Sequence, residues 1–336
     1  FNFLLSKNKS KEQLTGAYWQ IDLKNLQING ADFVFLDSLK QTYLTTKVER
    51  LEVDVEKFNI DKEIIFGDIQ MTAPKIVFSE YNDHLNPDTS LFTLIFPFAF
   101  SADNLRIAKG SFKYNNIAFQ AQPNKFDINR LSLSGIELDI DDVVQLNNVL
   151  DAQINTLSTR EKSGIEIKSL KTKFSLANSH LYLSNLDLKT NRSEIKNSIK
   201  LNFKRFRDFN ENIANVYIDA NLNQSKLFGA DLAYFPLKID SFLNNEIVIS
   251  GHIKGKLSNI QAKQLSLSVN KNIFIEGNIS ATGLPKIDQT VFNADFKRIE
   301  SNIANVAAIL PPSVKLPEQV LKIGNFNFTG IFNGKY

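Results

Sequence analysis

Alternation of apolar and polar residues runs through much of this chain and constrains its fold more than any other feature. The segments 216–222 (VYIDANL) and 265–269 (LSLSV) each place an apolar side chain at every second position. Successive side chains of a β-strand point to opposite faces of a sheet. The pattern therefore predicts many strands with one apolar and one polar face, whereas sustained helical periodicity is scarce.

A recurring motif interrupts this alternation. An alternating apolar pair is followed by two polar residues and then by a second alternating apolar pair. The copies span Ile21–Ile28, Val53–Ile60, Phe126–Leu133, Leu181–Leu188 and Leu321–Phe328. A straight strand would turn the second pair to the wrong face. The sequence therefore predicts a β-bulge or tight turn at pairs such as Lys24–Asn25, Ser184–Asn185 and Gly324–Asn325.

Composition sets the limits on class and partners. The chain has 336 residues, of which 43% are apolar and 22% charged, so it has enough apolar material to fold. A net charge of +3 is too small to argue for nucleic acid as a partner. Cysteine is absent, which excludes disulfides and thiolate chemistry.

Few segments depart from the strand pattern. Helical spacing predicts short helices at Ser301–Leu310 and Ser225–Phe235, each stopped by a following proline. The best loop candidates are 81–90 and 191–197, and no clear linker divides the chain, so residues 1–336 are expected to form one continuous segment. The most apolar run, Leu91–Phe100, is too short to span a membrane.

Signatures of catalysis or metal binding are missing from the sequence. His84, His180 and His252 have no second ligand at metal-binding spacing. Gly251–Lys256 (GHIKGK) is one residue short of a phosphate loop and has Leu257 where Ser or Thr is needed. The acidic residues of 139–142 lack the glycine of a calcium loop, and a solvated strand end is expected there. We predict no enzyme activity, cofactor or metal.

One basic aromatic segment leaves several interpretations open. Lys200–Phe209 (KLNFKRFRDF) interleaves cations with phenylalanines. Such a segment fits single-stranded nucleic acid, phospholipid headgroups, or an edge strand protected by charge. An ordinary surface is the default, and we expect no nucleic-acid partner.

A long series of half-apolar strands has to hide its apolar face in a sandwich, a barrel or a curled sheet. No clear boundary near the middle of the chain supports a compact sandwich. We therefore expect a mainly β fold, an elongated, curled antiparallel sheet that forms an open groove, with a few short helices. Its lining would include Ile21, Leu23, Phe33, Phe35, Val53, Val55, Leu181, Leu183, Leu265 and Leu267. The alternative for each of these residues is ordinary core packing.

Two stretches carry a resemblance to a known family. Trp19–Ser38 (WQIDLKNLQINGADFVFLDS) resembles the repeated strand pair of AsmA-like proteins, specifically the TamB-type proteins of Bacteroidota. Ile247–Leu310 is similar to the body of that family, with SGHIKGKLSNI, then IEGNISATGLP, then a short helix. The family has no catalytic residues.

The resemblance implies a periplasmic β-groove that moves phospholipid between the inner and outer membranes, its acyl chains in the groove. It also implies an inner-membrane helix upstream of residue 1, a C-terminal region beyond this segment, and a BamA-like or TamA-like outer-membrane barrel as a partner in protein assembly.

Two other functions remain open at this point. The first is a structural or adhesin-like array of β-sandwiches that binds protein or glycan. The second is a secreted β-helical enzyme acting on polysaccharide, which would need paired carboxylates on one exposed sheet face. The sequence shows no convincing pair.

Overall fold

The computed structural model describes residues 23–38, 41–59, 63–80, 99–117, 120–121, 126–204, 208, 212–232, 234, 244–286, 289–310 and 316–335. Most of these residues belong to strands. The strands are β1 (Asn25–Asp37), β2 (Thr42–Asn59), β3 (Glu63–Thr72), β4 (Lys75–Glu80), β5 (Ala99–Asn116), β6 (Ser132–Leu146), β7 (Val149–Glu161), β8 (Glu166–Ala177), β9 (His180–Lys189), β10 (Glu194–Asn202), β11 (Tyr217–Phe228), β12 (Glu246–Lys256), β13 (Asn259–Val269), β14 (Ile273–Thr282), β15 (Val291–Asn302) and β16 (Asn325–Lys335).

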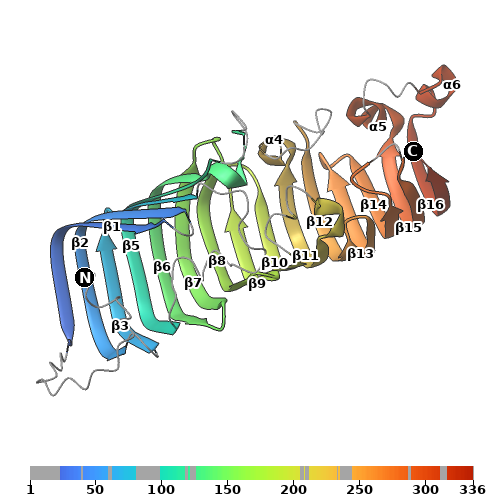
Figure 1. The fold of residues 1–336 in the computed structure, drawn as a ribbon. Coiled ribbons are helices and arrows are strands. Elements are labelled where there is room, and N and C mark those ends of the chain that lie inside the picture. Colours follow the sequence, from blue (N-terminus) through green and yellow to red (C-terminus); the bar gives the residue numbers. More distant parts are fainter. Residues whose placement is uncertain are drawn as a thin grey trace, which may run out of the picture.

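All of these strands form one sheet. It has 16 strands, and apart from β4 they follow one another in chain order from β1 to β16. Figure 1 shows them side by side in a single long row, with the N-terminal strands at one end and the C-terminal strands at the other. At a spacing of about 4.8 Å between strands, the row is on the order of 70 Å long. The mainly β, curled and elongated fold predicted from the sequence is confirmed.

One part of the sheet departs from simple antiparallel order. β3 and β4 are two pieces of one bent strand, separated by Ala73 and Pro74, and both run parallel to β5. β4 also pairs with the first part of β2, while β3 pairs with its second part. The strands at this end of the sheet bend over along their upper part (Figure 1).

Irregularities of register recur in most strands and keep the apolar side chains on one face. Asn185 has a left-handed backbone (φ 52°) where the β9–β10 register shifts, so the bulge predicted at Ser184–Asn185 is confirmed. Gln264 (φ 50°) occupies the equivalent step in β13. The pairs Lys24–Asn25 and Gly324–Asn325 instead lie where β1 and β16 begin. An extra residue restores the side-chain phase and bends the strand, so these bulges contribute to the curl of the sheet.

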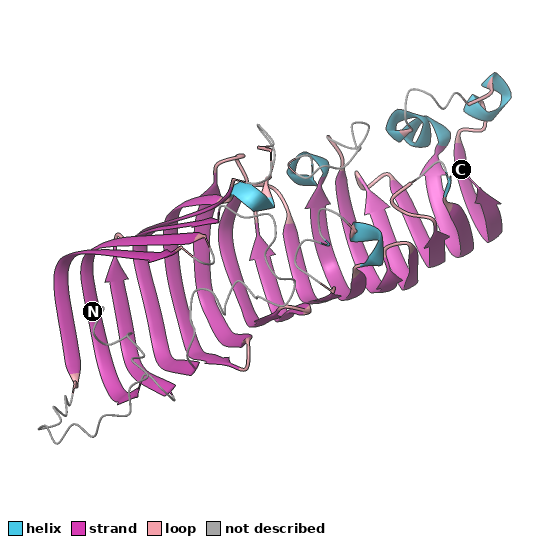
Figure 2. Ribbon diagram, in the orientation of Figure 1, coloured by secondary structure: helices cyan, strands magenta, loops and turns pink. Residues whose placement is uncertain are grey.

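The helices are short and lie at strand ends. Two are single 3-10 turns, η1 (Ile128–Arg130) and η2 (Ile213–Asn215). Three are α-helical, α4 (Gly229–Leu232), α5 (Ile303–Ile309) and α6 (Glu318–Leu321), along one long edge of the sheet (Figure 2). No helix within the described ranges is long and apolar enough to cross a membrane.

Two of the local predictions can be compared directly with these elements. The helix expected at Ser301–Leu310 is confirmed as α5, which the Asn302 side chain caps by accepting from the backbone N–H of Ala304. The helix expected at Ser225–Phe235 is wrong, because β11 continues to Phe228 and leaves only the single turn of α4. Of the apolar residues spaced as on a helix, Leu227 belongs to β11, Ala230 belongs to α4, and Tyr234 follows α4.

The two predicted loops have different outcomes. Residues 81–90 lie outside the described residues. The loop expected at 191–197 is shorter than predicted, because β10 already begins at Glu194. The turn is held by the side chain of Asp231 in α4, which accepts hydrogen bonds from Thr190, Arg192 and Ser193. These bonds lower the pKa of Asp231 against the effect of burial.

Candidate functional site

The two faces of the sheet differ sharply in exposure. In β2, Val53 and Val55 are 8% and 7% exposed, whereas Asp54 between them and Glu56 beside them are exposed. The same contrast holds in β13, where Leu265 is buried and its neighbours Gln264 and Ser266 are exposed. Such a difference in exposure is expected between the inner and the outer side of a curled sheet. We call the two sides the apolar face and the polar face.

Apolar side chains form cross-strand rows along the sheet. In the first row, neighbouring members lie directly opposite one another from β2 to β16. It contains Phe58, Ile64, Phe100, Gln145, Leu150, Leu176, Leu181, Leu201, Ile218, Gly255, Ile260, Ala281, Phe292 and Gly334. None of these residues is charged. The row extends the apolar face over almost the full length of the sheet.

A second row runs parallel to the first and begins in β1. It contains Ile28, Leu51, Met71, Ile107, Leu138, Leu157, Leu170, Leu188, Ile195, Ser225, Ile249, Leu267, Ile275, Ile299 and Phe328, with a register shift between Ile195 and Ser225. Ser225 is its only polar member. Its hydroxyl is buried and accepts a hydrogen bond from the backbone N–H of Lys196.

Most of the predicted lining residues belong to this face. Leu181 and Leu267 are members of the two rows, and Val53, Val55, Leu183 and Leu265 lie on the same face between them. Leu23 is half-buried just before β1, and Ile21 lies outside the described residues. Phe33 and Phe35 lie beyond the bend of β1, where Phe33 is 45% exposed and opposes Thr46. The register that joins these residues into rows could not be predicted from the sequence, because local alternation does not specify which residues of two strands pair.

Large and small residues alternate over the C-terminal part of the apolar face. Glycine or alanine in one strand lies beside isoleucine, leucine or phenylalanine in the next. The alternating positions are Gly251, Ile253 and Gly255 in β12; Leu265, Ala262 and Ile260 in β13; Gly277, Ile279 and Ala281 in β14; Phe296, Ala294 and Phe292 in β15; and Gly330, Phe332 and Gly334 in β16. Because inner side chains crowd in a curled sheet, this alternation gives each large side chain room beside a small one.

The polar face is held by exposed ion pairs between neighbouring strands. Asp219 in β11 lies 2.7 Å from the Nε2 atom of His252 and 3.2 Å from the Nζ atom of Lys254. The hydrogen bond from His252, followed by Lys254, lowers the pKa of Asp219. At the other end of the sheet, Lys47 pairs with Asp32 at 2.7 Å. Exposed pairs of this kind contribute at most about 1 kcal/mol each.

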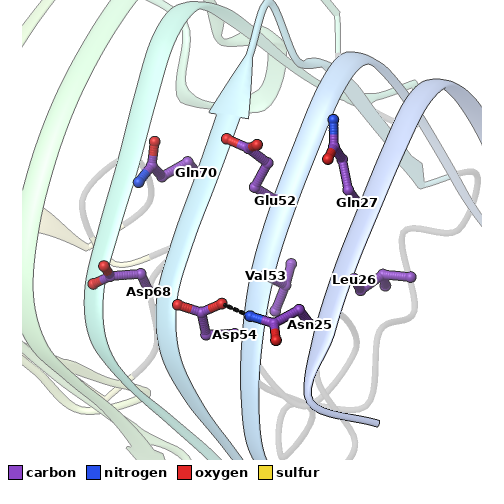
Figure 3. Close-up of a pocket in the computed structure, with 8 residues that line it drawn as sticks. All are labelled: Asn25, Leu26, Gln27, Glu52, Val53, Asp54, Asp68 and Gln70. Atoms are coloured by element: carbon purple, nitrogen blue, oxygen red, sulfur yellow. Dashed lines mark hydrogen bonds between the residues drawn. The ribbon is translucent and has the colours of Figure 1, made fainter.

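A shallow polar cavity of about 270 Å³ lies on β1, β2 and β3. It is lined by Asn25, Leu26, Gln27, Glu52, Val53, Asp54, Asp68 and Gln70. Figure 3 shows the amides and carboxylates of these three neighbouring strands, with Asn25 donating a hydrogen bond to Asp54. Across the described ranges, no three His, Cys, Asp or Glu side chains are grouped to hold a metal ion. The cavity therefore offers a polar surface of amides and carboxylates.

The other motifs considered in the sequence lie on ordinary strands. Gly251–Lys256 is part of β12, so it is not a phosphate-binding loop. Residues 139–142 lie within β6, where Asp139 pairs with Arg106, so the predicted strand end is wrong. His180 stacks on Tyr182 and shares a hydrogen bond with Ser175. His84 lies outside the described residues.

The basic aromatic segment is only partly described. Lys200 lies over the ring of Tyr182 on the polar face, 5.7 Å from its centroid. Phe203 is buried, and the backbone N–H of Lys204 donates to Asp208. Residues 205–207 and 209 lie outside the described residues. The Lys200 cation therefore contacts a neighbouring strand within the fold.

No known family model, curated protein or solved structure matches this chain. Its functional interpretation therefore depends on the geometry of the apolar face and on the resemblance carried by its two strand-pair segments.

Proposed function

We propose that this chain is a lipid-conducting segment whose apolar face binds the acyl chains of phospholipids along the length of the sheet. The observation that supports this proposal is the uncharged row that passes from Phe58 in β2 to Gly334 in β16. A binding site for one small molecule would need a closed pocket of a few hundred cubic ångströms. A row that continues across strand after strand instead fits a ligand that moves along it.

The energetics favour a continuous lining. Exposing an acyl chain to water costs about 0.8 kcal/mol per CH₂ group, or roughly 12 kcal/mol for a sixteen-carbon tail. A tail that stays against apolar side chains at every step avoids most of this cost. One charged residue on the path would restore a barrier of several kcal/mol.

The resemblance to TamB-type proteins adds the cellular setting to the proposal. In this setting the segment lies in the periplasm, and phospholipid passes between the inner and outer membranes. Assistance to outer-membrane protein assembly with a BamA-like barrel is a second activity of the same setting. The described strands belong to a single sheet, which offers no second layer for a β-sandwich adhesin.

Co-purification and transfer of lipid test the proposal. Native mass spectrometry of the purified chain should show bound phospholipid, and the chain should accelerate phospholipid exchange between vesicles. Val53→Asp and Phe58→Asp each place a charge on the apolar face, and Phe58 is 47% exposed, so the second change leaves folding intact. Both should reduce exchange at least tenfold.

The matched control is Gln70→Asp, which adds the same charge to an exposed position of the polar face in the neighbouring strand. It should leave exchange unchanged. Normal exchange by folded Val53→Asp and Phe58→Asp variants, or no bound lipid in the unmodified chain, would contradict the proposal.

A further inference from the structure

The polar face changes its sign of charge between β7 and β8. Rows of directly opposed residues run along the middle of this face. In β2–β7 these rows carry the carboxylates Glu52, Asp54, Asp68, Asp139, Asp141 and Asp151, with Arg106 among them. From β8 to β13 the rows carry Lys171, Lys173, Lys196, Lys200, Lys254 and Lys263, with Asp187 and Asp219 among them. One half of the polar face is therefore acidic and the other half is basic.

Hydrogen bonds in the acidic half leave its charge in place. Asp68 accepts a hydrogen bond from Asn104, and Asp141 accepts one from Asn155, each at 2.7 Å. The donors are neutral amides, which satisfy a carboxylate oxygen without cancelling its charge. The acidic half therefore keeps negative charge that a cation from outside the chain can pair with.

The basic half has a matching excess of cations. Lys171 and Lys173 of β8 are both exposed. Asp187 lies directly opposite both Lys171 and Lys196, so one carboxylate is shared by two cations, and Lys173 lies opposite the uncharged Ser184. The two halves are thus complementary in charge to each other and lie side by side on one face.

We propose that the polar face packs against the polar face of a second copy of this chain, with a twofold axis parallel to the strands and between β7 and β8. This axis places the basic half of each copy over the acidic half of the other and keeps each residue at its level along the strand. Lys173 is level with Asp141 through Gln153 of β7. In the dimer Lys173 lies one strand spacing, about 5 Å, to the side of Asp141 of the other copy, which its long side chain can span.

Other occupants of this face fit its charges less well. A flat anionic membrane that covered the basic half would also meet the adjacent acidic half, which repels it. A twofold axis perpendicular to the strands would set each half against its own kind. A second copy with the axis parallel to the strands pairs both halves at once.

The curl of the sheet sets the strength of this contact. The polar face is the outer, convex side, so two copies touch along the middle of the strands, where the charged rows run. Such a contact is mainly electrostatic and therefore weakens with salt. The apolar face of each copy stays open, so the inference and its tests are independent of lipid binding.

Light scattering at two salt concentrations tests the association. The Debye length falls from about 30 Å at 0.01 M salt to about 3 Å at 1 M. The unmodified chain at micromolar concentration should have twice the mass of one copy at about 0.01 M salt and the mass of one copy at about 1 M. A monomer at low salt, or a dimer that salt does not weaken, would overturn the proposal.

Charge reversal tests the complementarity of the two halves. The double variants Lys171→Glu/Lys173→Glu and Asp139→Lys/Asp141→Lys should each weaken the dimer at least tenfold at low salt, because like charges then face each other. An equal mixture of the two variants should form a dimer again, since each supplies the charges that the other lacks. Failure of the mixture to dimerise, with circular dichroism showing both variants folded, would overturn the proposal.

A matched control keeps the change in net charge but moves it away from the contact. Lys271 and Lys286 are exposed in turns beyond the strand ends. Lys271→Glu/Lys286→Glu should therefore leave the dimer intact. Equal weakening by this control would show that only net charge matters and would overturn the proposed contact.

Zero-length crosslinking of the unmodified chain tests the position of the axis without any substitution. A carbodiimide joins lysine to carboxylate, and an equal mixture of unlabelled and nitrogen-15-labelled chains distinguishes links between copies from links within one. Mixed-isotope peptides should join Lys173 to Asp141, which β7 separates within one chain. Same-isotope links alone would overturn the proposed arrangement.

Flotation with vesicles tests the membrane as the alternative occupant. The unmodified chain and Lys171→Glu/Lys173→Glu are compared on vesicles of phosphatidylcholine and on an equal mixture of phosphatidylcholine and phosphatidylglycerol. Both chains should float to the same extent with each kind of vesicle. A loss of flotation in the variant that occurs only with phosphatidylglycerol would overturn the proposal in favour of an anionic membrane.

Discussion

The N-terminal strands β2–β9 and the C-terminal strands β12–β16 build the same apolar face in different ways. The N-terminal strands use mostly large side chains, such as Ile69, Leu105 and Ile140, packed around the buried Ala102. The C-terminal strands alternate large residues with glycine and alanine. The comparison shows that a curled sheet can fill its inner face either mostly with large side chains or with large side chains that alternate with glycine and alanine.

The glycines make this difference explicit. In the N-terminal part, Gly135 is left-handed (φ 61°), but a Cβ atom there would meet nothing within 4 Å. In the C-terminal part, a Cβ atom on Gly277 (φ 155°) would lie 2.2 Å from the backbone oxygen of Asp295 in the adjacent strand. Glycine is favoured at position 135 by the left-handed backbone, whereas at position 277 the close approach of the adjacent strand leaves no room for a Cβ atom.

The largest expected effect separates these two glycines. Gly277→Ala should lower the free energy of unfolding by about 4 kcal/mol, because backbone in β15 has to move away from the new methyl group. Gly135→Ala should cost about 1 kcal/mol, the ordinary penalty of a left-handed alanine. Urea unfolding of both variants measures the difference. Equal losses would show that the two parts do not differ in packing.

Two core substitutions, one from a large to a small residue and one from a small to a large residue, test the same comparison with smaller expected losses of stability. Leu186→Ala in β9 should cost about 3 kcal/mol, because it leaves a cavity in a face filled with large residues. Ala294→Leu in β15 should cost about 2 kcal/mol, because the site lies beside the large residues Ile279 and Phe332. Thermal unfolding of each variant gives the ranking. A stabilising Ala294→Leu would mean that the alternation leaves unfilled space.

The strand content of both parts could be predicted from the sequence, but the way in which the strands assemble could not. Alternation and the bulge at Asn185 could be predicted, because side-chain phase is a local property of the chain. The helix expected at Ser225–Phe235 was wrong, because residues 225–228 pair with β12, and local spacing does not reveal such pairing. The parallel course of β3 and β5 and the large–small alternation of β12–β16 depend on contacts between distant residues, which local patterns do not contain.

The smallest expected difference in stability between the two parts comes from the ion pairs of the polar face. Asp219 contacts two side chains, the ring of His252 and the cation of Lys254, whereas Asp32 pairs with Lys47, and both Asp32 and Lys47 are more than half exposed. Asp219→Asn should cost about 0.5 kcal/mol at pH 7, and Asp32→Asn should have no measurable effect.

The pH dependence of that difference follows from the lowered pKa of Asp219. A carboxylate with a lowered pKa stabilises the fold above its ordinary pKa of about 4, and the stabilisation disappears as pH falls through the lowered value. The unmodified chain and Asp219→Asn should therefore begin to converge in stability as pH falls below about 4 and should be equal below the lowered pKa of Asp219. A difference that persists at lower pH would show that the loss at pH 7 does not come from the charge.

The central claim is that acyl chains lie against the apolar face in both parts of the sheet. Photo-crosslinking amino acids at Leu181, Leu201 and Ile279 on the apolar face, and at Lys200 and Gln261 on the polar face, test it directly when the chain is illuminated with phospholipid vesicles and analysed by mass spectrometry. The expected result is lipid adducts at the three apolar-face positions and none at the two polar-face positions. Adducts on the polar face, or none on the apolar face of the folded variants, would contradict the account.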